Sequence, residues 1–567
     1  MNHRLHSDAG VIRPIVKTSP PAGASPPPTR LRRLRRLGRG GRAGRWRRPG
    51  WTDMDARRSV QVACLLTFGL HLLFLSRELT SDEGGFAMVA RGWRATGPYL
   101  YGAQWVDRPP GLLVVFEAAQ ALGPFGVRLM AGICATALVA AAAWAAGAIG
   151  GSRAATWSAW TAFALATSPF LGAYQLNGEL IAAPLVMLAS AAALHALYRS
   201  SRPTRTLLLG LVSGAAGASA VLVKQNFVDG LVFAGIFLLS SVIPRRGPLQ
   251  RALLLATGLV AGAAIPVGAA AWWATSRAGI RALVYAMYGF RSDAGDVIAM
   301  HSLAAPEARL GTLVELAFAS GIGLLVTQLA LSQWRALFHP SPVVWAVTGA
   351  AAVELVGVLL GGNYWPHYLI ALIPMLALVT GLAAGRPLSG HPVPARVRRA
   401  RHGTQLVALL AVLTTMVAAP ADAVAVHSYR SHSYQVGRWL ASSAKGTDTV
   451  VVPFTHPNVI DESGLSSPYP YSWSLPVRTL DPGLNLLTHT LTRLHGAPTW
   501  VVRWDAPHTW GLDPQDHVSH ALQTRYREVA VVCGHPVWLL RGVHRSLPVL
   551  PEGCGPSYSV SSPASSS

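Results

Sequence analysis

The sequence is poor in charged residues, above all in acidic ones. Only 13% of its 567 residues are charged, with 25 Asp and Glu against 48 Lys and Arg, while 51% are hydrophobic. This composition excludes an ordinary soluble protein of such length, because several apolar runs approach the ~20 residues that cross a bilayer. The runs are long Ala, Leu, Val and Gly blocks rather than the short alternating segments of a membrane barrel. The composition therefore predicts a polytopic α-helical membrane protein.

Cysteine is also scarce, with four residues and neither a CxxC motif nor a zinc-binding spacing. Cys64 and Cys134 lie in apolar segments, where we expect them to be packing residues. Cys533 and Cys554 lie in the polar C-terminal region, where they either form a disulfide, if this region is outside the cell, or stay reduced. No metal site is predicted. His517 and His520 share a helix face but lack a third ligand at matching spacing.

Much of the formal charge of +23 lies in one tail, because residues 1–58 hold fifteen Arg and Lys against three Asp. A Pro/Ser-rich stretch precedes the arginines, and such a composition cannot build a core. We therefore expect a disordered cytoplasmic tail that contacts membrane lipids, and no nucleic-acid partner. The first apolar stretch comes too late in the chain for a signal peptide.

Apolar spans predict about eleven transmembrane helices, with thirteen as the upper limit. Loops 199–205, 244–247 and 385–403 carry arginine without acid, which predicts a cytoplasmic side, whereas loops 77–108 and 274–310 mix both signs. The N-terminus is then inside and the C-terminal region outside. Residues 109–125 must not cross, and we expect an amphipathic helix along the outer interface. The predicted spans are 60–76, 128–148, 154–172, 178–198, 207–223, 227–243, 252–273, 311–331, 343–361, 366–384 and 404–420.

The pattern changes after about residue 420, where apolar runs become short and strand-like and alternate with helical patterns. This alternation predicts a small extracytoplasmic α/β domain. The expected strands are 449–454, 499–504, 529–533 and 537–541, and the expected helices 484–496 and 517–529. The predicted organisation is a tail over 1–58, a membrane module over 59–420 with its first external loop at 77–127, a domain over 421–545 and a disordered end over 546–567.

Ionisable residues at membrane depth are costly and are therefore functional candidates. On the predicted topology most of the candidates gather on the external face. Lys224 stands out because the chain uses lysine only three times. The candidate site residues are Asp82, Glu83, Asp107, Arg108, Glu179, Lys224, Arg291, His367 and Tyr368. The aromatic residues Tyr99, Tyr101 and Trp105 either stack on sugars or form an interfacial belt.

A carboxylate and a cation on the external face suit one reaction well. Nucleotide-activated substrates stay in the cytoplasm, so an external enzyme has to use a substrate already in the membrane. In sugar transfer from a polyprenyl phosphate, a carboxylate takes the proton of an acceptor hydroxyl. A cation stabilises the negative charge that develops on the leaving phosphate, and arginine does so without losing its own charge.

Residues 82–129 carry a specific resemblance. They begin with Asp82-Glu83, continue with Asp107-Arg108 before two prolines, and end with a Phe-Gly and an Arg-Leu pair. This order resembles the first external loop of the GT-C glycosyltransferases, above all the family 39-like group of protein O-mannosyltransferases and aminoarabinose transferases. The resemblance extends over roughly 60–420, including the surroundings of Glu179, Lys224 and His367. Arg108 replaces a common lysine, and Phe86 replaces a common tyrosine.

The resemblance implies a role for each residue. Asp82 is the expected catalytic base of an inverting displacement, and Glu83 is expected to shape the same catalytic site. Arg108 would hold the donor phosphate, and Asp107 would orient the acceptor or sugar. The remaining candidates, Glu179, Lys224, Arg291, His367 and Tyr368, would bind the donor.

Other functions remain open at this stage. The same charges would line the pathway of a transporter or flippase of lipid-linked sugars, although repeated halves and midplane helix breaks are not evident. A non-catalytic envelope scaffold would tolerate loss of Asp82. The sugar, the acceptor (lipid, polysaccharide or protein) and a divalent metal ion are left open. Arginine over lysine and Ala/Gly richness indicate a GC-rich genome, hence a bacterial plasma membrane.

Overall fold

The computed structural model describes residues 51–93, 99–242, 249–300, 304–334, 341–386, 394–427, 430–506, 508–552 and 554. The predicted N-terminal tail lies outside the described residues up to residue 50, and so does most of the predicted disordered end. The described residues are mostly helical, with four short strands near the C-terminus. This agrees with the predicted helical membrane protein.

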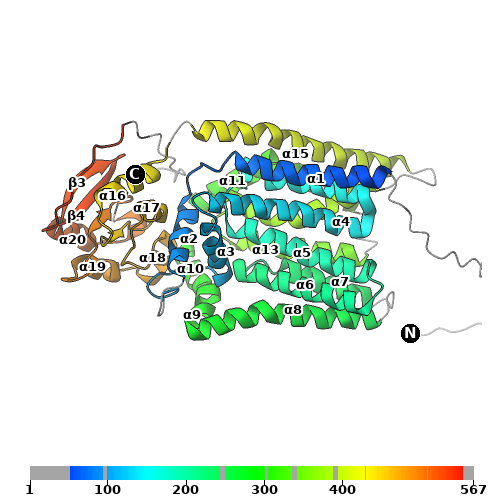
Figure 1. Ribbon diagram of the computed structural model, residues 1–567, viewed down its shortest axis with the longest axis horizontal. Coiled ribbons are helices and arrows are strands. Elements are labelled where there is room, and N and C mark those ends of the chain that lie inside the picture. The colour runs from blue at the N-terminus through cyan, green and yellow to red at the C-terminus, as the bar shows by residue number, and fades with distance from the viewer. Residues whose placement is uncertain are drawn as a thin grey trace, which may run out of the picture. The chain divides into compact units, whose positions relative to one another are not determined.

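Seven helical segments of the described chain are long and apolar enough to cross a bilayer, or eight if one bent pair is counted as a span. They lie side by side in Figure 1. The bent pair is α11 (Ala304–Ala319) with α12 (Ile322–Gln333), which meet at 73°. The predicted eleven crossings therefore stay a prediction. The seven segments are α4 (Gly126–Ala166), α5 (Gly178–Tyr198), α6 (Pro203–Val223), α8 (Leu249–Ser276), α13 (Pro342–Leu360), η5 (Pro366–Leu372) with α14 (Ile373–Gly385), and α15 (Ala395–His427).

Helix α4 holds two of the predicted crossings, 128–148 and 154–172, within 41 residues and the turn that follows. Its backbone leaves the helical conformation at Gly151, where φ is 69°, a value that glycine adopts without a steric penalty. The second half folds back along the first, as the hydrogen bond from the Ser158 hydroxyl to the Ala142 carbonyl (3.0 Å) indicates. Helix α4 is thus a helical hairpin, which accounts for part of the difference between the eleven predicted spans and the seven long helical segments.

Glycines let neighbouring membrane helices approach closely. A Cβ on Gly214 of α6 would collide with the Leu259 carbonyl of α8, and one on Gly262 of α8 would collide with the Leu211 carbonyl of α6. Close backbone contact of this kind stabilises helix pairs in lipid, where apolar burial gives little driving force. The glycine-rich composition therefore has a direct structural use in this pair.

Shorter helices lie between the long helices and the strands (Figure 1). Helix α3 falls within residues 109–125 and, with 11 residues, is too short to cross a bilayer. It buries Leu112, Leu113 and Phe116, so it is packed into the protein as well as being short. The other short helices there are α2 (Ser81–Arg91), α9 (Ile280–Val284) and α10 (Phe290–Ala299), and the remaining elements of this part of the chain are α1 (Trp51–Leu72), η2 (Pro169–Leu171), α7 (Asp229–Val242) and η3 (Tyr285–Gly289). Helices α1 and α7 lie among the long helices (Figure 1).

The four strands form one sheet in the order β1-β2-β4-β3, in which β1 and β2 are parallel and the other pairs antiparallel. Its central strand β2 is fully buried. We call residues 432–540, which hold the sheet and its helices, the sheet region. Its strands lie at β1 (Val450–Val451), β2 (Trp500–Val502), β3 (Tyr526–Val532) and β4 (His535–Leu540), and its helices at α16 (His432–Ser443), α17 (Pro457–Ser463), α18 (Ser474–Leu480), α19 (Asn485–Thr492), η6 (Thr509–Gly511) and α20 (His517–Arg525). The domain limits 421–545 and its external position stay predictions.

The sheet region contacts helix α2 and the loop between α2 and α3. The Trp105 amide donates a hydrogen bond to the Pro470 carbonyl (3.2 Å), and the Gln104 side chain donates one to the Ser467 carbonyl (2.9 Å). Arg91 of α2 forms an ion pair with Asp461 of α17 (3.0 Å). These contacts join the sheet region to the end of α2 and to the loop that follows it.

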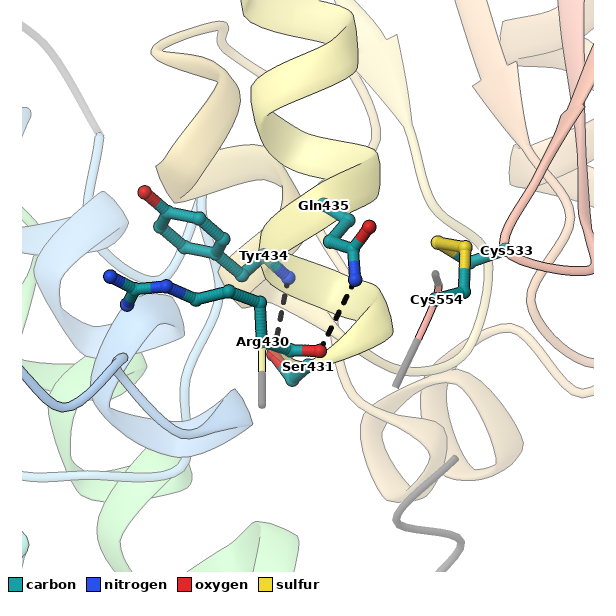
Figure 2. Close-up of a disulfide and its surroundings, with 6 residues drawn as sticks. All are labelled: Arg430, Ser431, Tyr434, Gln435, Cys533 and Cys554. Carbon is teal, nitrogen blue, oxygen red and sulfur yellow. Dashed lines mark hydrogen bonds between the residues drawn. A yellow bond between two sulfur atoms is a disulfide. The ribbon is translucent and has the colours of Figure 1, made fainter. Parts of the chain in front are cut away.

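A disulfide joins Cys533, in the turn between β3 and β4, to Cys554 near the end of the described chain. Figure 2 shows this bond together with Arg430 and Ser431, which precede α16, and Tyr434 and Gln435 in its first turn. Of the two alternatives left open by the sequence, the structure has the disulfide. Cys64 and Cys134 are free and partly buried, in apolar helices as expected.

Candidate active site

Helix α2 begins with a capping box that fixes the position of Asp82. The Thr80 hydroxyl accepts a hydrogen bond from the Glu83 amide (3.4 Å), and the Glu83 carboxylate accepts one from the Thr80 amide (3.0 Å). This reciprocal pair satisfies amide groups that a helix start leaves unpaired. Asp82 therefore lies in the first turn of α2, and the capping box fixes where that turn begins.

Glu83 points away from that site. Its carboxylate also accepts hydrogen bonds from the Thr80 hydroxyl (3.0 Å) and the Leu176 amide (2.8 Å), and it pairs with Arg128. The Glu83 side chain is 1% exposed and that of Arg128 is 2% exposed. A carboxylate engaged by this many donors has no free lone pair for a substrate. The geometry favours a positioning role for Glu83 over the catalytic role expected from the sequence.

Asp82 has a different environment. Its Oδ1 accepts a hydrogen bond from the indole Nε1–H of Trp473 (2.9 Å), a residue of the sheet region. Among the described residues nothing donates to its Oδ2. Asp82 is only partly buried, so one carboxylate oxygen is held and the other is available.

A second group of charges surrounds Asp107. One oxygen of Asp107 pairs with Arg108 (2.7 Å) and also with Arg291 from α10. Burial would raise the pKa of Asp107, but the two guanidinium groups outweigh burial and lower it. Burial would likewise lower the pKa of Arg108, but Asp107 and the other acidic groups nearby raise it. Both groups therefore stay charged at neutral pH.

A third group lies where α5, α6 and η5 meet. Glu179, in the first turn of α5, pairs with Lys224 at the end of α6, and the His367 Nε2 lies 3.7 Å from the same Glu179 oxygen. The Lys224 ammonium lies 4.7 Å from the centre of the Tyr368 ring. Asn177 caps α5 through its side chain, which accepts from the Leu180 amide (2.8 Å). These contacts hold a lysine at the end of a membrane helix.

The three groups belong to one site. Arg108 lies within electrostatic range of Asp82, Glu179 and Tyr368. His367 lies within range of Asp82 and Arg108 as well as of Glu179. The structure thus brings together all of the predicted site residues except Glu83, which stands behind Asp82 as its support.

Sequence reasoning missed two residues of this neighbourhood. Arg128 was part of the family pattern without an assigned role, and it neutralises Glu83. Trp473, which contacts Asp82, carries no local signal at all, because it lies 391 residues further along the chain. Trp105 is buried, and Tyr101 is engaged through its hydroxyl. Tyr101 donates to the Arg108 carbonyl (2.7 Å), and Trp105 packs on the Phe290 ring (4.4 Å between centroids).

An apolar groove of about 600 Å³ lies between α3, α4 and α5. Its lining includes Val115 of α3, Trp144 of α4 and Ile181 in the first turn of α5. The groove is lined almost entirely by apolar side chains.

No family model and no curated protein sequence matches the chain. Among solved structures, ArnT of Cupriavidus metallidurans bound to undecaprenyl phosphate matches with a TM-score of 0.58 and 16% identity, over 85% of this chain and 97% of ArnT. The oligosaccharyltransferase of Archaeoglobus fulgidus in complex with Zn and sulfate matches with a TM-score of 0.53 and 13% identity, over 83% of this chain and 71% of that one. Both are GT-C superfamily membrane glycosyltransferases. This chain has the GT-C fold. The GT-C resemblance of residues 82–129 is thereby confirmed at the level of the fold.

A metal ion does not fit the residues of this GT-C site. No three His, Cys, Asp or Glu side chains converge as a metal site in the part of the chain that the structure describes. Asp107 and Glu179, the carboxylates nearest to the cations, are already engaged by arginine and lysine. The mechanism proposed below therefore uses side chains alone.

Proposed function

We propose that this chain is a membrane glycosyltransferase that moves a sugar from a polyprenyl-phosphate donor to an acceptor hydroxyl or amine. The observation that carries the proposal is the meeting of Asp82, with one free carboxylate oxygen, and the cations Arg108, Arg291 and Lys224 at one end of a GT-C bundle. The chemistry of this site needs a base and an anion-binding group, and the residues supply both.

In the proposed reaction the acceptor oxygen or nitrogen attacks the anomeric carbon of the sugar as the bond from that carbon to the phosphate oxygen breaks. Asp82 takes the acceptor proton through its free oxygen. The bonding electron pair leaves with the polyprenyl phosphate, whose added negative charge Arg108, Arg291 and Lys224 stabilise. A single displacement of this kind inverts the anomeric centre.

Two further features support a lipid-linked donor. The lining of the apolar groove between α3, α4 and α5 reaches Ile181 in the first turn of α5, the turn that also carries Glu179, so we infer that a polyprenyl chain lies in the groove with its phosphate toward Lys224. ArnT, which shares the fold, is known in a complex with undecaprenyl phosphate. We infer that Glu179, His367 and Tyr368 orient the donor around Lys224, and that Asp107 holds the two arginines in place.

The proposed site faces the outside of a bacterial plasma membrane, with the N-terminus in the cytoplasm. Two observations support this orientation. The arginine-rich loops predict their own side as cytoplasmic, and the Cys533–Cys554 disulfide of Figure 2 belongs in an oxidising compartment. The proposed extracytoplasmic domain, residues 421–545, and the site then lie on the same side of the membrane.

The test is transfer from a panel of radiolabelled polyprenyl-phosphate sugars in membranes containing wild type, Asp82→Asn or Asp296→Asn. The first change keeps the shape of Asp82 and removes the base. Asp296 is an exposed acid of α10 in the same part of the molecule, so its variant controls for a lost charge. We expect Asp82→Asn to lower transfer by about a hundredfold or more, the scale of a lost general base, and Asp296→Asn to leave it unchanged.

Equal transfer by wild type and Asp82→Asn would remove Asp82 from the mechanism. If wild type transfers no sugar but moves the labelled lipid across sealed vesicles, the protein is a transporter and the proposal fails.

A further inference from the structure

The sheet region reaches into the site through one side chain. Trp473 precedes α18 and donates its indole Nε1–H to Oδ1 of Asp82 (2.9 Å). This is the one hydrogen bond to the Asp82 carboxylate within the described residues. The free energy of a hydrogen bond to an ionised group exceeds that of a neutral pair, so the contact defines how the carboxylate is turned.

The surroundings of Trp473 are built for this contact. Its ring packs on Phe86 of α2, with centroids 5.6 Å apart. A Cβ on Gly85, beside it on α2, would overlap both the Trp473 ring and Pro457, so glycine at this position is what lets the indole approach the helix. Phe86 has no polar group, and its ring gives the tryptophan an apolar surface to pack against.

The segment that carries Trp473 also contacts the loop that leads to Asp107. Ser467 and Pro470 accept hydrogen bonds from Gln104 and Trp105 in the loop that leads to Asp107. The Tyr471 ring meets the Trp105 ring edge to face, with centroids 6.3 Å apart. The same loop that presents Arg108 is therefore tied to the segment that fixes Asp82.

We propose that Trp473 is a positioning residue of the transferase. It holds Oδ1 of Asp82 and thereby turns Oδ2 toward the acceptor. This inference rests on the proposed function, in which Asp82 is the base. It makes the sheet region a functional part of the active site, not only an attached domain, because removal of one donor in residues 467–473 would leave the base free to rotate.

The experiment compares Trp473→Phe with Trp538→Phe in the full-length protein. Phenylalanine keeps an aromatic ring at position 473 and removes the donor. Trp538, on β4 of the sheet region, has a buried indole N–H that finds no partner among the described residues, so the same change there removes no hydrogen bond. We expect Trp473→Phe to lower kcat by about ten- to a hundredfold, the range for a hydrogen bond to a charged group, with the donor KM within about twofold. Trp538→Phe should change neither.

A double variant separates positioning from packing. Trp473 acts through Asp82, so Asp82→Asn/Trp473→Phe should transfer sugar no more slowly than Asp82→Asn alone. If the phenylalanine variant folds poorly, benzothienylalanine at position 473, which replaces the N–H by sulfur in a ring of almost the same shape, should show the same loss of kcat.

Two results would overturn the inference alone, both with Asp82→Asn showing the expected loss of about a hundredfold but a rate that can still be measured. One is an unchanged kcat in a well-folded variant that lacks the donor. The other is an equal loss from Trp473→Phe in the wild-type and the Asp82→Asn backgrounds. Full transfer by Asp82→Asn overturns the proposed function and this inference with it.

Discussion

The buried ion pair behind Asp82 gives the sharpest test of how the site is supported. Arg128 pairs with Glu83 and donates further hydrogen bonds to the carbonyls of Glu78, Tyr174 (3.2 Å) and Arg77 (3.3 Å). Arg128→Met has nearly the same volume but leaves the Glu83 carboxylate buried without a counter-charge. Breaking a buried pair from one side costs about 3–5 kcal/mol, so we expect a loss of that size in the free energy of unfolding.

The second variant in this test is Arg128→Met/Glu83→Gln. It removes the stranded charge, and its amide oxygen can still accept from one of the two amides, Thr80 or Leu176, that donate to the two oxygens of Glu83. It should recover at least half of the lost stability, because removing both charges of a buried pair is close to neutral. Arg153→Met, on an exposed position of the same helix α4, should stay within about 0.5 kcal/mol of wild type.

The assay is unfolding of the purified protein in detergent, followed by tryptophan fluorescence. The expected order of unfolding midpoints is wild type and Arg153→Met highest, the double variant next, and Arg128→Met lowest. A double variant no more stable than Arg128→Met would refute the account, because the stranded charge would then not be the cause. Arg128→Met should also lower sugar transfer, since the start of α2 carries Asp82.

Two further predictions concern regions away from Asp82. Glu354 is 1% exposed, and neither of its carboxyl oxygens has a partner among the described residues. Glu354→Met should therefore raise the unfolding midpoint, whereas Glu315→Met, on an exposed face of α11, should leave it unchanged. A lower midpoint for Glu354→Met would mean that this carboxyl binds a group of its own. The disulfide closes a loop over a separation of 21 residues, so Cys533→Ser/Cys554→Ser should lower the free energy of unfolding by about 3 kcal/mol. A reductant should lower the free energy of unfolding of wild type by the same amount and leave that of the variant unchanged.

The sequence predicted those parts of the site that are local or mark a helix end. Asp82 follows the first apolar helix, Arg108 precedes two prolines, and Lys224 is one of three lysines. Each stands out against an apolar background because a charge at membrane depth is costly. The site could therefore be found without knowing how the helices pack, since their ends must come together on one side of the bilayer.

For Glu83 the sequence holds two conflicting signals, the spacing of a capping box and the pairing with a neighbouring acid. Thr80 and Glu83 have the spacing of a capping box, which predicts that Glu83 turns back to its own helix start. The adjacent acid pair drew attention to catalysis instead. The structure separates the two roles, because Arg128 and three further donors engage Glu83 while Asp82 keeps one oxygen free.

Trp473 could not be predicted, because nothing in its local sequence distinguishes it from the other tryptophans of the chain. Its partner Asp82 is 391 residues away, and the contact depends on how the segment around Pro470 pairs with Trp105. Long-range contacts of this kind are fixed by tertiary packing and not by local pattern. The helical hairpin of α4 is intermediate, since Gly150-Gly151 marks the break but not the direction of the second half.

The cations of the site are already paired with carboxylates before a donor binds, and this has a consequence for the proposed reaction. Arg108 and Arg291 share Asp107, and Lys224 pairs with Glu179. A donor phosphate has to draw these cations partly away from their carboxylates, so part of the binding free energy is lost in the ground state. As the sugar leaves, the phosphate gains negative charge and competes better for the same cations. The paired carboxylates thus weaken donor binding more than they weaken the transition state, which is the condition under which binding groups raise kcat.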